Sequence, residues 1–469
     1  MTFSSNYEQN KKDLETALRI NENFDLLCKD TVIGGKNACF FFVDGFTKDE
    51  VMQKLLSGFY TIKPQDMPDS ALDFSIQQLP YIEVDIADDL TQAITSILSG
   101  MTALLIDGYS SAICMDVRTY PARSVDQPEK EKVLRGSRDG FVETVVFNTA
   151  LIRRRIRDPK LTMEMFSIGS VSHTDVVLCY MKDTIDTNLL DYVRKHLKNA
   201  KVRSLTMNQT SLAECLYKRK WYNPFPKYKY TERPDTAAAS VMEGSLVILV
   251  DNSPSAIILP TSLFGIMEEA DDYYLPPITG TYLRLTRFLI STITFFITPV
   301  FLLLTMYPEW IPEWLSFIQL GEYTNVPLMF QFLILEVAID GLRLAAINTP
   351  SMLSTPLSII AGLALGEYAV SSGWFNAEAM LYMAFVALSN YTQPSYELGY
   401  ALKFFRMITL ILTGFFGIWG LIAGTLLLFI ALLSNRTIDG QRRYLYPLIP
   451  FDRKTLKRQL LRLRRDEDS

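Results

Sequence analysis

The sequence predicts a chain of two parts: an α/β N-terminal cytoplasmic region of two duplicated subdomains, followed by an α-helical polytopic membrane domain. Three observations predict it. The 469-residue chain has mixed polarity up to about residue 280, whereas residues 288–433 are mostly apolar. Two stretches of the first part match each other without a gap. Three charges lie inside one apolar run of the second part, which favours a membrane protein with a polar interior.

The internal match joins residues 100–115, GMTALLIDGYSSAICM, to residues 244–259, GSLVILVDNSPSAIIL. Each copy reads as a buried strand, a turn and a returning strand, which is typical of a hairpin. A helical segment precedes each hairpin, and further upstream each half offers a strand and an amphipathic helix. These elements are 40–46, 48–60 and 88–99 in the first half, and 174–181, 187–197 and 235–243 in the second. Chance resemblance between short α/β units is the alternative, but we expect a true duplication, each half with a small mixed sheet.

Composition and charge divide the chain into seven segments. We expect an N-terminal helical lead-in (1–30), a first α/β subdomain (31–120), a charged linker (121–140), a second α/β subdomain (141–262), a juxtamembrane segment (263–287), a transmembrane domain of four to five apolar segments (288–433) and a basic cytoplasmic tail (434–469). A basic segment just after a membrane span favours contact with anionic lipid headgroups over nucleic acid.

A helix is predicted at 141–159, with four arginines at its C-terminal end: Arg153, Arg154, Arg155 and Arg157. Cations there interact well with the helix dipole, which is the simplest interpretation. Contact with acidic headgroups or with a partner chain is the alternative.

Several functions find no support in the sequence. Its two histidines are His173 and His196, and no phosphate-binding loop, dinucleotide fingerprint, zinc-protease or nucleophile-elbow motif is present. We therefore expect no enzyme, no metal site and no cofactor. The five cysteines are scattered without CxxC spacing, which suits a reducing compartment. No apolar signal-peptide core is visible in the first 30 residues, so the N-terminal region should stay in the cytoplasm.

The clearest membrane span is 288–307, with Arg284 and Arg287 just before it. The loop that follows carries glutamates but no lysine or arginine, so the positive-inside rule places the arginines in the cytoplasm and the loop outside. We expect Arg284 and Arg287 to anchor the inner membrane interface, and Trp310 and Trp314 the outer one.

The later apolar segments are 327–347, 357–374, 379–394 and 405–433. Five full crossings would place the basic tail outside, against the positive-inside rule, so we expect 357–374 to be re-entrant or interfacial. The spacing of Gly417, Gly420 and Gly424 would let helices approach closely.

The charges Glu336, Asp340 and Arg343 share one face of the helix predicted at 327–347. Each ion at mid-membrane costs about 3 kcal/mol or more, so this face must meet protein or water. Either one carboxylate pairs with Arg343 within the helix, or the charges surround a water-filled path that symmetry repeats in an oligomer. Glu367, in the next apolar segment, favours the hydrated path.

Five stretches together resemble the A-subunit family of bacterial spore germination receptors, of GerA type. They are residues 135–159, NPFPKYKYTERPD (223–235), EGSLVILVDNSPSAIILPTS (243–262), DDYY (271–274) and YLRLTRF (282–288). The resemblance covers residues 30 to 450. Where receptor subunits carry a REAGLR-like segment, this chain reads DGLRLAAINTPSMLSTPLSIIAG (340–362), so it need not share their ligands.

The resemblance implies a multi-pass protein of the spore inner membrane with a cytoplasmic N-terminal domain. It also implies ring-shaped homo-oligomers with a central ion path, and partners among the dipicolinate channel components and receptor-type subunits. Two hypotheses follow. The first is a homo-oligomeric cation channel subunit that opens during germination. The second is a scaffold that docks other germination proteins through its cytoplasmic domain.

Overall fold

The computed structural model describes the chain except for residues 1, 5, 80, 82, 119–130, 132–135, 218–221, 322–323, 350–361, 363–365, 367 and 463–469. The chain forms two compact units, which we call the sheet unit and the helical unit. The sheet unit comprises Met1–Lys218 and Tyr228–Pro260, and the helical unit comprises Arg219–Lys227 and Thr261–Ser469. The short segment 222–227 therefore belongs with the helices rather than with the predicted second subdomain, because Phe225 is buried and stacks on Phe405 at 5.6 Å.

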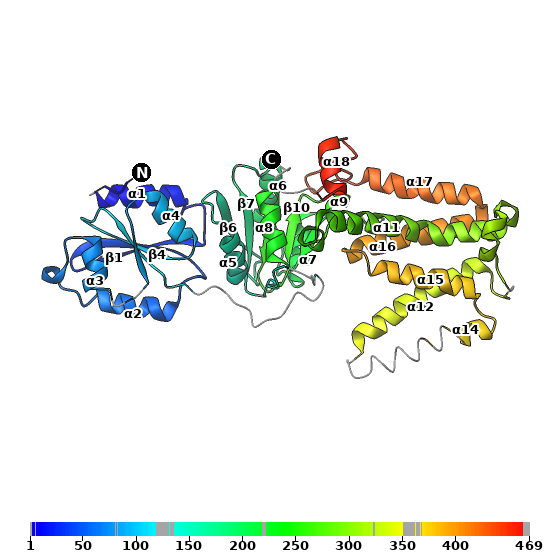
Figure 1. The fold of residues 1–469 in the computed structure, drawn as a ribbon, viewed down its shortest axis with the longest axis horizontal. Coiled ribbons are helices and arrows are strands. Elements are labelled where there is room, and N and C mark those ends of the chain that lie inside the picture. Colours follow the sequence, from blue (N-terminus) through cyan, green and yellow to red (C-terminus); the bar gives the residue numbers. More distant parts are fainter. Residues whose placement is uncertain are drawn as a thin grey trace. The chain divides into compact units, whose positions relative to one another are not determined.

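The sheet unit contains two five-stranded sheets with the same strand order, β1-β2-β4-β5-β3 and β6-β7-β9-β10-β8 (Figure 1). The first sheet consists of β1 (Leu26–Ile33), β2 (Lys36–Val43), β3 (Val84–Ala87), β4 (Thr102–Ile106) and β5 (Ala112–Met115). The second consists of β6 (Leu161–Ile168), β7 (Thr174–Met181), β8 (Lys229–Thr231), β9 (Leu246–Val250) and β10 (Ala256–Leu259). The predicted pair of sheets, each with a hairpin, is confirmed.

The prediction that these sheets are mixed was wrong. Every paired neighbour among the described strands runs antiparallel. The reason is positional. Strands β3 and β4 run in the same direction, but β5 lies between them and pairs with both, so no parallel ladder forms.

Both halves also follow one order of elements: helix, two strands, two helices, strand, helix, two strands. The helices of the first half are α1 (Tyr7–Leu18), α2 (Asp49–Phe59), α3 (Ala71–Gln77) and α4 (Leu90–Leu98), with a 3₁₀ turn at Pro64–Asp66. Those of the second are α5 (Val145–Arg155), α6 (Thr187–Lys198), α7 (Asn208–Leu216) and α8 (Pro234–Met242). Helix α1 thus corresponds to α5 and opens the repeat.

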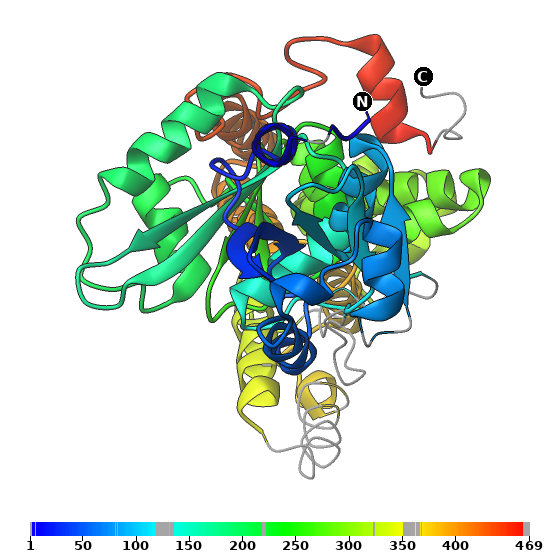
Figure 2. The ribbon, with the colours of Figure 1, turned by 90° about the vertical axis from the view of Figure 1, so that its left-hand side faces the viewer.

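Side chains alternate between the two faces of the first sheet, and each face carries its own pair of helices (Figures 1 and 2). On β2, Cys39 and Phe41 pack with α1 and α4, whereas Phe40 packs with α2 and α3. Leu14 and Leu18 of α1 are buried in this core. The structure therefore places the segment predicted as a separate lead-in, 1–30, inside the first subdomain.

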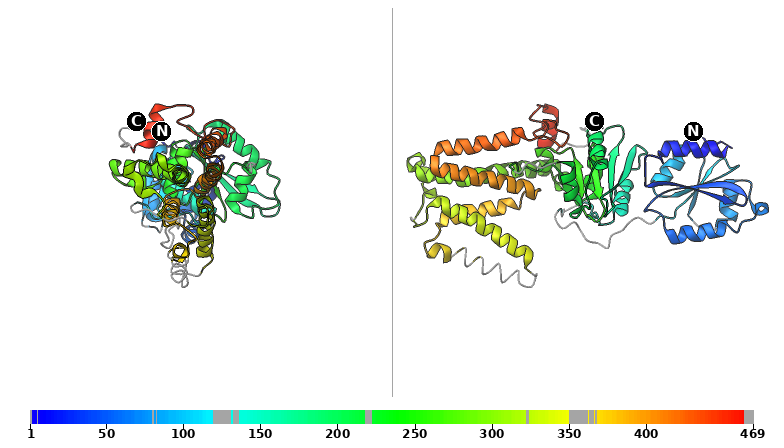
Figure 3. Two further views of the ribbon diagram at one scale, coloured as in Figure 1. Left: turned by 90° about the vertical axis from the view of Figure 1, so that its right-hand side faces the viewer. Right: turned by 180° about the vertical axis from the view of Figure 1, so that it is seen from behind.

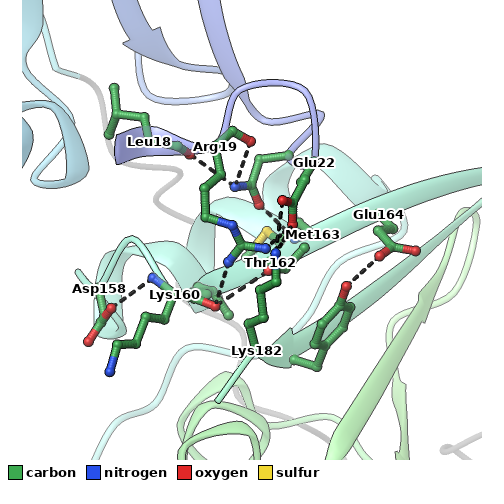
Figure 4. A network of polar contacts seen from close by, with 12 residues as sticks. Leu18, Arg19, Glu22, Asp158, Lys160, Thr162, Met163, Glu164 and Lys182 are labelled. Carbon is green, nitrogen blue, oxygen red and sulfur yellow. Dashed lines mark hydrogen bonds and ion pairs between the residues drawn. The ribbon is translucent and has the colours of Figure 1, made fainter. Parts of the chain in front are cut away.

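The connector between α1 and β1 joins the two halves of the sheet unit (Figure 4). The Asn23 side-chain oxygen accepts a hydrogen bond from the backbone N–H of Met163 at 2.8 Å, and Phe24 N–H donates to the Met163 carbonyl at 3.2 Å. Glu22 forms ion pairs with Arg19 and with Lys182, and these cations lower the pKa of Glu22 to about 2. The connector thus lies along the open edge of β6.

Arg153 reinforces this junction from α5. Its guanidinium donates two hydrogen bonds to the Asp25 carboxylate, at 2.8 and 3.0 Å, and a third to the Leu161 carbonyl at 3.2 Å. Both charged side chains are buried. For Arg153 the structure thus differs from the dipole interpretation, because this residue is a cross-link between the two halves. Arg155 agrees with it, since its guanidinium donates to the Leu151 carbonyl of the same helix at 2.8 Å.

The helical unit contains α9 (Leu263–Ile266), α10 (Asp271–Tyr274), α11 (Pro277–Met306), α12 (Leu328–Asn348), α14 (Tyr368–Ser371), α15 (Ala377–Asn390), α16 (Tyr396–Phe416), α17 (Ile418–Ser434) and α18 (Arg453–Leu460), with 3₁₀ turns at Pro308–Trp310 and Glu313–Ile318. Among the described residues, the two helices α11 and α16 are long and apolar enough to cross a bilayer. The polytopic membrane domain therefore stays a prediction. Half of the predicted re-entrant segment 357–374 lies outside the described residues, and its re-entrant course also stays a prediction.

The predicted span 405–433 is two helices rather than one. Gly417 has a φ of +59° and ends α16, and α17 then returns beside it (Figures 1 and 3). A Cβ on Gly424 would lie 2.7 Å from Thr409 Cα, so the predicted close approach of helices at these glycines is confirmed. Because α17 reverses the chain, the tail returns to the end of the unit where α11 begins.

Candidate functional site

The charged face of α12 lies against α16, and its deepest group is Glu336, which is 3% exposed. Arg406 of α16 donates to Glu336 Oε1 from Nη2 at 2.6 Å and from Nε at 2.9 Å. Arg406 also donates to the Thr294 carbonyl of α11 at 3.3 Å. One buried guanidinium therefore holds three helices of the unit together.

Lys403 extends the network by one helical turn. Its ammonium lies 3.1 Å from Glu336 Oε2 and 2.6 Å from Asp340 Oδ2. The Lys403 side chain is buried, whereas that of Asp340 is 31% exposed. We call these four residues, Glu336, Asp340, Lys403 and Arg406, the buried charge network. Burial falls along it from Glu336 towards Asp340.

Arg343, the third predicted charge, takes no part in these ion pairs among the described residues. Its guanidinium carbon lies 5.2 Å from the centre of the Tyr391 ring and 5.7 Å from that of Tyr400. Cations over aromatic faces are attracted by the ring quadrupole. The predicted pairing of a carboxylate with Arg343 is therefore absent from the described residues, and α16 neutralises both carboxylates instead.

A second polar contact holds the other end of α12. Gln331 is 1% exposed, and its amide nitrogen donates to Thr324 Oγ1 at 2.6 Å and to Asn376 Oδ1 at 2.7 Å. Its oxygen accepts from the Asn376 backbone N–H at 2.8 Å, at the start of α15. Burial of these amides is tolerated because they satisfy one another.

Of the predicted interface anchors, the two tryptophans are exposed and the two arginines are buried. Trp310 and Trp314 are 46% and 75% exposed, and their role at the outer interface stays a prediction. Arg284 and Arg287 are buried in the structure and face Asp272 of α10, which is itself fully buried. The carboxylates just before α11 take up both guanidinium groups, and the predicted role of these arginines at the inner interface stays a prediction.

The cluster around Asp272 also includes Glu269, which lies 2.7 Å from Arg287 Nη2. Burial raises the pKa of Glu269, although the neighbouring Arg287 opposes the shift. Arg284 Nη1 points the other way and donates to the carbonyls of Arg458 and Gln459, at 3.1 and 2.9 Å, in the last turn of α18. A cation satisfies the free carbonyls of a helix C-terminus well. This contact places the basic tail beside the first turns of α11.

Three comparisons with known proteins address identity. Residues 13–468 match the family described as Bacillus/Clostridium GerA spore germination protein. The chain belongs to the GerA spore germination family. It is 36% identical over 458 residues to stage V sporulation protein AF of Bacillus subtilis (strain 168), with 97% of this chain and 92% of that protein covered. It is 28% identical over 448 residues to spore germination protein A1 of the same organism, with coverage of 95% and 92%.

A solved structure is also similar to this GerA-family chain: the N-terminal domain of the A subunit of the Bacillus megaterium spore germinant receptor GerK3. The identity is 24% and the TM-score 0.43, over 55% of this chain and 96% of that one. The family resemblance that the sequence motifs predicted is confirmed. Membership in a family of germination proteins also fits the expectation that the chain is not an enzyme.

The sequence interpretation missed the two cations of the network, Lys403 and Arg406. The signal was present, because they lie three residues apart within an apolar run, just as Glu336 and Asp340 lie four apart. The predicted span began at residue 405 and left Lys403 outside it. Glu367, the remaining predicted site residue, lies outside the described residues.

The cysteines offer little chemistry. Cys28 of β1 and Cys39 of β2 are joined by a disulfide, which the expectation of a reducing compartment did not foresee. Their sulfurs and the Asp30 carboxylate lie within 4.8 Å of one another, but bonded sulfurs are not thiolate ligands. Burial raises the pKa of the Cys114 thiol to about 11, and it also raises the pKa of Cys179. Thiols of this kind are poor nucleophiles at neutral pH.

Replacing Asp272 with asparagine should loosen the C-terminal helix of this GerA-family chain. The change leaves Arg284 and Arg287 buried with one carboxylate fewer, which destabilises a protein by about 3–5 kcal/mol. Because Arg284 also holds the end of α18, we expect faster trypsin cleavage between residues 453 and 462 in detergent micelles. The control is Glu309→Gln, which changes an exposed acid in the loop after the C-terminal end of α11. Equal cleavage rates in both variants and the wild type would contradict the assignment.

Proposed function

We propose that this GerA-family chain is a subunit of a germination complex in the spore inner membrane, with the sheet unit in the cytoplasm. In this proposal several copies form a ring-shaped homo-oligomer that releases cations through a central path. Its partners would be other germination membrane proteins. The observation that carries the proposal is the buried charge network between α12 and α16.

The network is hard to explain by stability alone. Glu336 and Arg406 are 3% and 1% exposed inside a unit whose other helix contacts are mostly apolar. Apolar side chains of similar volume often stabilise a protein as well as a buried ion pair does, or better. Ionisable groups at such depth in membrane segments are typical of ion pathways. The network therefore favours transport over a purely structural role.

The gradient of burial suggests how the path is controlled. Asp340 is the partly exposed member, and around it α12 exposes Val337, Leu344 and Ile347, at 67%, 60% and 74%. A neighbouring copy would cover this half of α12 in a ring. In the described state Lys403 neutralises Asp340, so the path would be closed. Separation of α12 from α16 would free the carboxylate to attract cations.

The test is ion flux through the full chain in proteoliposomes. Asp340→Asn should lower the preference for cations over anions by about fivefold, because one charge in a water-filled path contributes about 1 kcal/mol. Asp340 is chosen because its partial exposure makes misfolding less severe than at Glu336. The readout is the reversal potential in a salt gradient, with assembly checked by light scattering.

The matched control is Glu313→Gln, which removes an exposed charge from the loop after α11. It should leave selectivity unchanged. If Asp340→Asn assembles normally and conducts with wild-type flux and selectivity, the channel proposal fails.

A scaffold function is the second candidate, and one observation favours it. Helix α3 exposes Leu72 and Ile76, at 57% and 72%, one turn apart on the same face. Exposed apolar pairs of this kind favour protein contacts. If Leu72→Ser/Ile76→Ser abolishes capture of other germination membrane proteins by the full chain, while Asp340→Asn changes no flux, the scaffold is the better account.

A further inference from the structure

The C-terminal helix α18 and the turn before it have a composition that neither proposed function uses. We propose that residues 448–458 form a binding surface for anionic phospholipid headgroups of the same membrane in which the helical unit lies. The surface consists of the cations Arg453, Lys454 and Lys457 and the apolar residues Leu448, Ile449 and Phe451. The inference rests on the helical unit lying in a bilayer, but it does not require ion conduction.

Contacts with α11 fix the position of α18 relative to the membrane. Arg284 of α11 holds the last carbonyls of α18, and Thr281 accepts a hydrogen bond from Arg462 N–H at 3.0 Å. Arg284 lies four residues before Phe288, where the apolar run of α11 begins, or about 6 Å along the helix. The headgroup region is about 5–7 Å deep on each side of a bilayer. The end of α18 is therefore held at headgroup level.

The exposed cations of α18 lie close together on the helix. Arg453, Lys454 and Lys457 are all exposed, and their positions i, i+1 and i+4 lie within an arc of about 100° on a helix. Asp452, the nearby acid, is engaged as the helix cap: it accepts from Lys454 and Thr455 N–H at 3.0 and 3.2 Å. A hydrogen bond from the Tyr446 hydroxyl, together with those from Thr455 and Lys454, lowers the pKa of Asp452 to about 2. One side of α18 therefore presents three exposed cations close to one another.

The turn before α18 adds exposed apolar side chains. Leu448, Ile449 and Phe451 are 45%, 47% and 69% exposed in the turn directly before α18. Exposed apolar side chains beside a basic helix are typical of segments that lie in the membrane interface, where the side chains enter the acyl boundary and the cations contact headgroups. A free anion such as phosphate would use the cations but not this apolar turn. The combination therefore favours a lipid.

The experiment uses the full chain in nanodiscs of phosphatidylcholine, with or without phosphatidylglycerol. A bimane label is attached at Ile449→Cys, in a background with Cys215→Ser because the other free cysteines are buried. Quenching of the label by spin-labelled phosphatidylcholine reports its entry into the bilayer. We expect quenching to rise with phosphatidylglycerol and to fall again at high salt, which screens such contacts.

The decisive variant is Arg453→Gln/Lys454→Gln/Lys457→Gln. It should abolish the phosphatidylglycerol effect, because each cation near an anionic surface contributes about 1 kcal/mol and three amount to roughly 100-fold in binding. The matched control, Lys195→Gln/Lys198→Gln/Lys201→Gln, removes three cations from the sheet unit and should keep the effect.

Three outcomes would overturn the inference: quenching that ignores phosphatidylglycerol in the wild type, an equal loss in the control variant, or removal of the effect by millimolar phosphate or by an RNA oligonucleotide. The last outcome would mean that the three cations bind a soluble anion rather than lipid headgroups. Failure of the channel proposal would leave these readouts unchanged, so it can be distinguished from failure of the lipid-binding inference.

Discussion

Replacing Arg406 with methionine is expected to destabilise the helical unit by about 3–5 kcal/mol, the usual effect of removing one partner of a buried ion pair. Glu336 would stay buried, at 3% exposure, but would lose both hydrogen bonds from the guanidinium. Lys403, at 3.1 Å, would remain as a partner, which places the expected value towards the lower end. The Thr294 carbonyl of α11 would also lose its donor.

The measurement is equilibrium unfolding of the full chain in mixed micelles. The double variant Glu336→Gln/Arg406→Met should be more stable than Arg406→Met alone, because no charge is then left unpaired. Comparison with both single variants and the wild type measures the coupling. The control is Arg436→Met, at an exposed position, with an expected change within about 0.5 kcal/mol. Wild-type stability of Arg406→Met would show that the pair does not form.

Replacing Arg153 with methionine should separate the two halves of the sheet unit, with a loss of about 3–5 kcal/mol. Asp25 would be left buried without the bidentate guanidinium that now neutralises it. The connector that carries Asp25 also pairs with Met163 of β6, so its loosening should expose the open edge of that strand.

Hydrogen exchange of the full chain measures this effect locally. Peptides that contain residues 19–25 and 161–168 should exchange faster in Arg153→Met, whereas peptides from α11 should not change. Arg157→Met, which removes an exposed cation four residues away, is the control. Double replacement with Asp25→Asn should restore part of the protection. Unchanged exchange at both segments would mean that Arg153 does not hold the junction.

Much of the sheet unit could be predicted from local patterns. The strand at 174–181 and the helix at 187–197 agree with β7 and α6 almost to the residue, because alternation and helical periodicity are read over short windows. The hairpin repeat predicted the duplication for the same reason. Mixed sheets were predicted where both sheets are antiparallel. Whether a sheet is mixed depends on which strands become neighbours, and the long connections between strands decide that.

In the helical unit the errors also have identifiable causes. Residues 407–433 carry no charge that would mark the turn at Gly417, and hydropathy alone cannot tell one long helix from two that pack at Gly417 and Gly424. The charged face of α12 was identified, but its partners on α16 were not. Periodicity places charges on a face without saying which helix packs there.

Sequence patterns were enough to predict the repeated order of the sheet unit, the location of the apolar helices, the polar face of α12 and membership in the GerA family. These properties depend on residues close together in the chain. The partners of the buried charges depend on packing: Arg153 pairs with Asp25, Arg406 with Glu336 and Arg284 with Asp272, over separations of 128, 70 and 12 residues. A buried charge pairs with the opposite charge that folding brings within about 3 Å. Which residue that is depends on the packing of elements far apart in the chain, and local sequence patterns do not contain this information.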